Sequence, residues 1–292
     1  MSLTSFIRVS DVRARLRKEF PVVPFRPKTE PPMQAPPLSR NYSLVGNAFD
    51  YLLRFHVKRL NPGAHESEWI AETVASHSQY FDGNRDWIFT GGKIRLDPQG
   101  ERDQRRARLV VKEARRHHAA FLRNGSGAEN LLRSALLLAQ LDPLLRASGI
   151  NFSWRRADLA DVRDLRRLLS VVEPRHFRTK RVCVLNPRFG EASELVGGAD
   201  ADLLLDGSLI EIKTTKLFEV KREWFDQLLG YYLLSRLDGI EGVDQRHRVT
   251  RLGIYFSRHG YLWTFKVQEV VDERRLPAMA RWFVKRASRE FS

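Results

Sequence analysis

The sequence predicts an α/β protein in which a small mixed sheet, flanked by helices, follows a large helical section. Two observations lead to this prediction. Apolar residues recur at helical spacing through most of residues 42–170. After about residue 180, short strand-like runs alternate with helix-like runs. Such an order is typical of a sheet with helices packed on its faces.

The composition describes a globular and strongly basic chain. Of its 292 residues, 42% are hydrophobic and 10% are aromatic, which is enough for a substantial core. Lysine and arginine outnumber aspartate and glutamate by 50 to 35, giving a formal net charge of +15. This excess favours nucleic acid as a partner, with an anionic membrane surface second, although a GC-rich genome would also produce an arginine-rich chain.

The sequence shows no sign of a disulfide framework or of a membrane segment. The one cysteine, Cys183, excludes internal disulfides, a cysteine zinc cluster and a cysteine-ligated iron–sulfur centre. Residues 1–20 lack the apolar run of a signal peptide, and the longest apolar stretch, residues 131–145, is interrupted by Asp142 and Pro143. We therefore expect a soluble cytoplasmic protein with no membrane partner.

Residues 1–41 are expected to form an N-terminal segment that precedes the main domain. Residues 1–20 fit a short amphipathic helix. The next stretch, residues 20–38, holds seven prolines and predicts an extended arm that lies along the body or along a partner. The remainder, residues 42–292, is expected to be one domain.

That domain begins with a helix-like stripe over residues 42–60, followed by a mainly helical insertion over about 66–170. Gly125 is a C-cap signal for one of its helices. The helix before that glycine is strongly basic, through Arg102, Arg105, Arg106, Lys112, Arg115 and Arg116. Such a run favours a solvated face over a dedicated phosphate-binding track.

The sheet is expected within a core of about residues 176–275. The runs RVCVLNP, ADADLLL and SLIEIKT predict strands, and KREWFDQLLGYYLLSRL predicts a helix. The run RLGIYFSRHGYLWTFKV predicts a hairpin that turns at His259-Gly260. A closing helix is expected in ERRLPAMARWFVKRASREF.

The most informative stretch is GGADADLLLDGSLIEIKTTK, which starts at Gly197. Asp206-Gly207 is a strong signal for a two-residue hairpin loop, because glycine tolerates the positive φ of a type I′ turn. That loop would place Asp202 opposite Glu211, with Cβ atoms roughly 5 Å apart. Alternation then gives one apolar face that packs on a helix and one charged face. The charged face carries Asp200, Asp202, Leu204, Leu209, Glu211 and Lys213.

Two opposed carboxylates repel each other unless positive charge lies between them. A divalent metal supplies such charge, and Lys213 does so in part. Mg²⁺ prefers oxygen ligands and takes only a few protein carboxylates, with water and phosphate completing its shell. A lysine beside the metal can orient the attacking water. The alternative is the solvent-facing half of an amphipathic hairpin whose charges pair without a metal.

The next predicted helix carries Gln227 and Tyr231 four residues apart, on one face. Together with Asp202 and the triplet Glu211-Ile212-Lys213, this pair resembles the signature of the PD-(D/E)XK nuclease superfamily, in particular its RecB-like branch. The resemblance covers about residues 180–235. The run GNAFDYLLRF resembles an early helix of that branch, with Gly46 in place and Asp50 where a metal-binding histidine would stand.

The resemblance implies a restriction-endonuclease-like fold with Mg²⁺ or Mn²⁺ at the site and no iron–sulfur cluster. It implies that Asp202, Glu211 and the backbone carbonyl of Ile212 hold the metal, with Asp50 as a further candidate. Asp200 shares the face of Asp202 and is an alternative ligand. The resemblance also implies that Lys213 acts on the water, while Gln227 and Tyr231 position the substrate or support the site.

The function expected from this resemblance is metal-dependent hydrolysis of DNA phosphodiester bonds, in defence against foreign DNA or in repair and recombination. DNA is the expected partner, RNA is not excluded, and a protein partner or a homo-oligomer is a further expectation. The alternatives are a catalytically inactive nucleic-acid-binding module of the same fold and an RNase. No P-loop spacing and no G-x-S-x-G elbow is present in the sequence.

Overall fold

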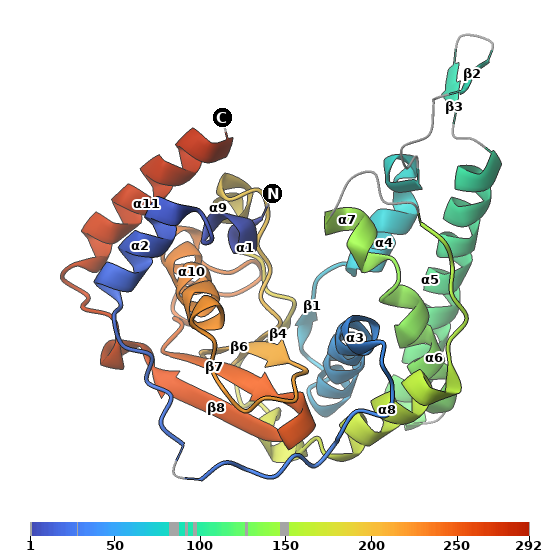
Figure 1. Cartoon of the computed structure of the whole chain (residues 1–292), viewed down its shortest axis with the longest axis horizontal. Helices are drawn as coiled ribbons and strands as arrows, with labels where there is room; N and C mark the ends of the chain where they lie inside the picture. Colours follow the sequence, from blue (N-terminus) through green and yellow to red (C-terminus); the bar gives the residue numbers. More distant parts are fainter. Residues whose placement is uncertain are drawn as a thin grey trace. The chain divides into compact units, whose positions relative to one another are not determined.

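A computed structural model describes residues 2–27, 29–81, 88–90, 93–95, 98–125, 128–146 and 152–291 (Figure 1). The chain forms two compact units. The sheet unit comprises Met1–Gln34, Leu60–Ser67 and Glu173–Ser292, and the helical unit comprises Ala35–Arg59 and Glu68–Val172.

A mixed sheet forms the centre of the sheet unit, as the sequence predicts. In its described residues the strands follow the order β1 (His65–Glu66), β4 (Cys183–Leu185), β5 (Leu203–Leu205), β6 (Ser208–Lys213), β7 (Arg251–Phe256) and β8 (Tyr261–Lys266). The pairs β1–β4 and β6–β7 are parallel. The other neighbouring pairs are antiparallel. The expected hairpin at His259-Gly260 is the turn between β7 and β8.

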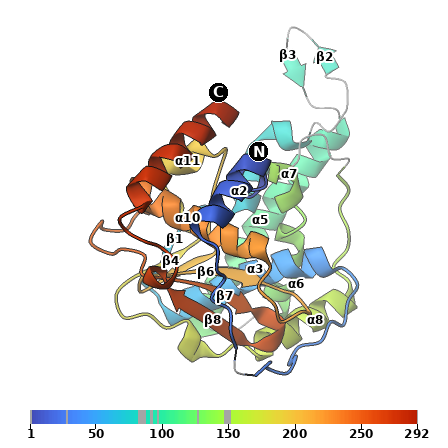
Figure 2. The same cartoon turned by 60° about the vertical axis from the view of Figure 1, so that its left-hand side comes forward.

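Helices α2, α10 and α11 lie on one face of the sheet (Figures 1 and 2). The helices of this unit are α1 (Leu3–Phe6), α2 (Ser10–Glu19), α9 (Glu191–Leu195), α10 (Arg222–Asp238) and α11 (Leu276–Phe291). The described residues of this unit also form the short 3-10 turns η2 (Pro174–His176), η3 (Ser257–His259) and η4 (Val267–Glu269). Because parallel strands require a crossover connection, α10 is the link that makes β6 and β7 parallel. The α10 and α11 helices confirm the sequence prediction.

The core beneath these helices includes the charge-bearing face of the β5–β6 hairpin, which the sequence does not predict. Leu204 and Leu209 share a single buried cluster with Phe225 of α10 and Phe283 of α11. The hairpin sequence predicts a helix on the opposite, fully apolar face and does not predict what covers the charged one. The charged face is apolar near the turn, at Leu204 and Leu209, and charged at the far end, at Glu211 and Lys213. Residues of α10 contact both parts.

The apolar side chains of the other hairpin face are also buried. Leu203, Leu205, Ile210 and Ile212 are each at most 9% exposed. Ala201 breaks the expected alternation, because it lies in the same cluster as Leu204. The reason is that β5 begins only at Leu203, so residues before it do not follow the pleat of the strand.

The N-terminal residues form two short helices, α1 and α2, where the sequence suggested one. The described part of the proline-rich arm then runs extended along the sheet unit. Phe25 anchors it, with ring centroids 5.2 Å from Trp263 and 5.3 Å from Phe218. Farther along, the Nε2 of Gln34 donates a hydrogen bond to the backbone oxygen of His259 at 3.0 Å.

The helical unit is mainly α-helical, as expected. Its elements are α3 (Tyr42–Leu60), α4 (Ile70–Ser76), η1 (Ser78–Phe81), α5 (Pro98–Asn124), α6 (Ala128–Leu138), α7 (Asp142–Arg146) and α8 (Leu159–Ser170). Gly125 closes α5 with φ of +73° and donates its N–H to Phe121 at 2.8 Å, which confirms the C-cap prediction. A two-stranded ladder of β2 (Ile88–Thr90) and β3 (Lys93–Arg95) was not predicted.

Among the described residues, no helix combines the length and the apolar character needed to cross a membrane.

Candidate active site

The hairpin of β5 and β6 has the predicted register. Leu203 pairs with Ile210, Leu204 with Leu209 and Leu205 with Ser208. The loop residues Asp206 and Gly207 have φ of +45° and +85°, as a type I′ turn requires.

The carboxylate of Asp206 holds the neighbouring chain segment against this turn. It accepts hydrogen bonds from the backbone N–H groups of Lys180 at 2.7 Å, Arg181 at 2.8 Å and Val182 at 2.9 Å. Burial works to raise the pKa of Asp206, but these bonds favour the charged form and hold the pKa below its usual value. The turn therefore fixes the approach to β4 as well as the hairpin.

Upstream of Leu203 the chain leaves β6 and pairs with residues 186–188 instead. The backbone N–H of Asn186 donates to the Asp202 oxygen at 2.9 Å, and the N–H of Ala201 donates to the Pro187 oxygen at 3.1 Å. Asp200 forms an isolated antiparallel bridge with Arg188. The ladder between β5 and β6 therefore ends at the pair of Leu203 and Ile210. The expected pairing of Asp202 with Glu211 is not part of this ladder, because Asp202 pairs with the segment at 186–188 instead.

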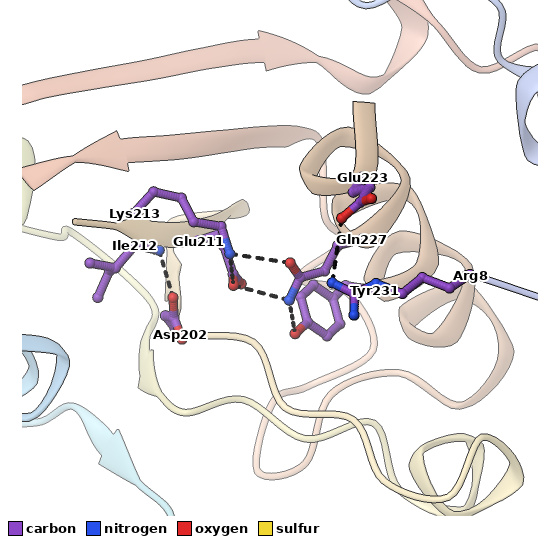
Figure 3. Close-up of polar contacts among 8 residues, drawn as sticks. All are labelled: Arg8, Asp202, Glu211, Ile212, Lys213, Glu223, Gln227 and Tyr231. Atoms are coloured by element: carbon purple, nitrogen blue, oxygen red, sulfur yellow. Dashed lines mark hydrogen bonds and ion pairs between the residues drawn. The ribbon is translucent and has the colours of Figure 1, made fainter. Parts of the chain in front are cut away.

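Asp202 remains joined to β6 through its side chain. Its Oδ2 accepts a hydrogen bond from the backbone N–H of Ile212 at 2.5 Å (Figure 3). In an antiparallel hairpin every second pair exchanges backbone bonds, so the Ala201 carbonyl would be the ordinary acceptor for this N–H. The carboxylate takes its place. Because N–H and C=O of one strand residue point to the same edge, the Ile212 carbonyl faces the edge where Asp202 lies.

Glu211 and Lys213 form an ion pair beneath α10. The Lys213 Nζ lies 2.8 Å from the Glu211 Oε1, and the two side chains are 19% and 8% exposed. The amide of Gln227 completes a triangle with them. Its Nε2 donates to the same Glu211 oxygen at 3.0 Å, while its Oε1 accepts from Lys213 at 3.2 Å (Figure 3).

Tyr231 closes the network on its buried side. Its hydroxyl accepts a hydrogen bond from the Gln227 Nε2 at 2.8 Å, and its ring stacks on Phe189 at a centroid distance of 5.6 Å. Burial raises the pKa of Tyr231 well above its usual value. The negative charges of Glu211, Asp200 and Asp202 raise it further, in that order. The Tyr231 phenol is therefore kept neutral by its burial and by the negative charge of these carboxylates.

The sequence of α10 explains why its side chains reach this centre. Trp224, Gln227 and Tyr231 follow helical spacing, so they share one side of the helix. Exposure falls along this row: Trp224 is partly exposed, Gln227 is 8% exposed and Tyr231 is 4% exposed. The row thus leads from the surface inward, and Lys213 meets it at Trp224, with its Nζ 5.6 Å from the ring centroid.

Asp50 belongs to the helical unit, on α3, and contacts a cation. The Nη2 of Arg54, one helical turn later, lies 2.5 Å from its Oδ2. Gly46 lies on the same helix. The role of Asp50 as a metal ligand stays a prediction.

The oxygen donors of the sheet unit are suited to a hard cation. In the described part of the chain, no three side chains of His, Cys, Asp or Glu form a group that could hold a metal ion. Mg²⁺ does not require three, because one or two carboxylates with water and phosphate suffice. Asp202, Glu211 and the Ile212 carbonyl supply hard oxygen atoms of that kind.

Of the expected site residues, the structure brings Glu211, Lys213, Gln227 and Tyr231 into one hydrogen-bonded network, with Asp202 bonded to the residue between Glu211 and Lys213. Sequence reasoning missed Phe189, which supports Tyr231 from the segment before α9. No local pattern marks that residue. In comparisons with known proteins, no family model, no curated protein and no solved structure matches this chain.

Proposed function

We propose that this protein is a metal-dependent nuclease that hydrolyses DNA phosphodiester bonds at the centre formed by Asp202, Glu211 and Lys213. The observation that supports this most strongly is the buried triangle of Glu211, Lys213 and Gln227. A carboxylate and an ammonium placed under a helix are costly to desolvate, so a purely structural role explains them poorly when apolar residues would fill the same space.

The fold proposed with this function is restriction-endonuclease-like. Support comes from the placement of the motif residues: the aspartate just before β5, the E-x-K triplet on the adjacent β6, and the glutamine and tyrosine on α10, the helix that follows. The sequence resemblance implies this order, and the described elements have it.

The proposed metal would be held by Asp202 and Glu211, with the Ile212 carbonyl as a third oxygen. When bound, Mg²⁺ supplies charge that polarises the phosphate and lowers the pKa of a bound water. Lys213 would orient the attacking water and stabilise the charge that develops on phosphate oxygen. Gln227 holds Lys213 and Glu211 at fixed positions, because it bonds to both. Tyr231 holds Gln227 and keeps its own proton.

The positive charge of the chain suits this substrate. With a net charge of +15, the protein is expected to bind DNA with an affinity that does not depend on base sequence and that falls steeply as salt concentration rises. Nothing in the site distinguishes deoxyribose from ribose, so RNA is tested alongside DNA.

The test is cleavage of linear duplex, supercoiled and single-stranded DNA, and of matched RNA, in Mg²⁺, Mn²⁺ or EDTA. We expect cutting by the wild type in metal only and no detectable cutting by Lys213→Ala. Lys285→Ala removes an exposed lysine of α11 and serves as the charge-matched control that keeps full activity. DNA binding without cutting in either metal would contradict the proposal that the protein is a nuclease and would favour an inactive binding module. Cutting of RNA alone would favour the RNase.

A further inference from the structure

Trp224 lies where the row of site residues on α10 reaches the surface. It stands one turn before Gln227, and it is partly exposed, whereas every described residue from Phe225 to Leu234 is buried. Part of its ring packs against the core of the sheet unit. The indole is therefore held firmly on one side while its remaining surface meets solvent beside the site.

Two lysine ammonium groups lie close to this ring. The Nζ of Lys213 is 5.6 Å from the ring centroid, and the Nζ of Lys221 is 5.5 Å from it. Both distances fall within the range of cation–π contacts, for which tryptophan is the best partner. One of the two lysines belongs to the proposed catalytic centre, and the other is exposed. A group that lies on the ring would be next to both charges.

The segment that joins β6 to α10 extends this surface. Of the eleven lysines in the chain, three fall within residues 213–221, although arginine is the commoner basic residue elsewhere. Lys216 and Lys221 are exposed, and Leu217 between them is 56% exposed. Basic groups interleaved with apolar and aromatic side chains are typical of surfaces that bind single-stranded nucleic acid.

We propose that Trp224 stacks on an unpaired base next to the phosphate that is cut, so that the substrate class of this site is single-stranded DNA or a frayed end. This inference rests on the proposed function, and it adds the substrate class to it. Inside a duplex the bases are already stacked and paired, and their faces are not available to an indole ring. An unpaired base offers its face, while its flanking phosphates come within reach of Lys216 and Lys221.

The alternative to base stacking is a structural role, in which Trp224 only covers the aliphatic stems of Lys213 and Lys221. The two explanations differ in what they predict for Trp224→Leu. Leucine keeps an apolar cover over the stems but has no ring on which a base can stack. Trp224→Phe keeps a smaller ring. Trp282→Leu is the matched control, because Trp282 is also partly exposed, packs against the same core and lies under an arginine, Arg15, at 5.6 Å.

The experiment measures fluorescence anisotropy of a labelled single strand and of its matched duplex, in EDTA so that nothing is cut. We expect Trp224→Leu to weaken binding of the single strand about 5- to 150-fold, the range for the loss of one stacked base. Binding of the duplex should stay within about twofold, and Trp224→Phe should lie between leucine and wild type. Trp282→Leu should bind both like the wild type.

A second measurement places the base. Single abasic positions are moved along the strand, and we expect one position to weaken binding to the wild type but not to Trp224→Leu. The inference is overturned if no abasic position has this effect, or if Trp224→Leu weakens single strand and duplex equally. These measurements need no catalysis. A wild type that never cuts DNA but shows the abasic effect would therefore contradict the proposed nuclease activity and leave the stacking on Trp224 supported.

Discussion

Gln227 donates a hydrogen bond from Nε2 to the Oε1 of Glu211 at 3.0 Å, so a neutral amide stands directly beside a buried carboxylate. The same nitrogen donates to Tyr231 at 2.8 Å, and the amide oxygen faces the Lys213 ammonium. The orientation of the amide is therefore determined by its neighbours: oxygen toward the cation, nitrogen toward the anion. A side chain of the same shape but different charge should disturb this arrangement in a measurable way.

Gln227→Glu should make stability depend on pH between about 4 and 7. The substitution places two carboxylates against each other, which raises the pKa of the pair in the folded state. The folded state then binds more protons than the unfolded state above a pH of about 4.3, so stability is lost as pH rises through this range. Urea unfolding at several pH values measures this pH dependence of the free energy of unfolding. Gln227→Met, of similar size and uncharged, should show no added dependence, and equal pH profiles for the two variants would contradict the contact with Glu211.

The ion pair of Glu211 and Lys213 should be more costly to break than to remove. Lys213→Met leaves a carboxylate that is 8% exposed without its ammonium, and we expect a loss of about 3 kcal/mol in the free energy of unfolding. The double variant Glu211→Gln, Lys213→Met removes both charges and should recover most of that loss. Both proteins should lack nuclease activity. A double variant as unstable as Lys213→Met would show that packing of the lysine stem, and not its charge, matters.

Asp202 should have separable structural and catalytic roles. Asp202→Ala removes the acceptor for the Ile212 N–H, a group that is buried at the end of the ladder, and should cost about 1–3 kcal/mol of stability. Asp202→Asn keeps an oxygen acceptor and should stay within about 1 kcal/mol of the wild type. Because the asparagine carries no charge, its cleavage activity should still fall to background. Full activity in Asp202→Asn would exclude this carboxylate as a metal ligand and direct attention to Asp200.

The part of this site that the sequence predicts is the part set by local rules. A glycine after Asp206 fixes the loop, the loop fixes the register, and helical spacing places Gln227 and Tyr231 on one side of α10. These rules act over a few residues, so one chain segment contains all the information. The same holds for α11 and for the hairpin of β7 and β8.

The remainder depends on contacts between distant segments. Pairing with residues 186–188 ends β5 at Leu203, and this competition has no signature in the hairpin itself. The helix that covers the charged face of the hairpin could not be predicted from the hairpin for a related reason, since alternation describes a strand but not what covers it. The ladder of β2 and β3 is a different case, because two glycines at 91–92 between strand-like runs were a recognisable turn signal.

Alkaline pH should destabilise the protein through its buried tyrosines, and Tyr231 should account for a defined share. Burial raises the pKa of Tyr51, Tyr231, Tyr232 and Tyr255. In the unfolded chain these phenols lose their protons near pH 10, so above that pH the folded state binds more protons and stability falls as pH rises. Each protected phenol contributes about 1.4 kcal/mol per pH unit to this slope. Tyr231→Phe keeps the stacking on Phe189 and should reduce the slope of unfolding free energy against pH by the contribution of one phenol. Urea unfolding between pH 9 and 11 measures this slope, and absorbance at 295 nm follows the ionisation of the tyrosines. An unchanged slope would mean that Tyr231 ionises in the folded protein, which would contradict the burial of its hydroxyl beneath Gln227.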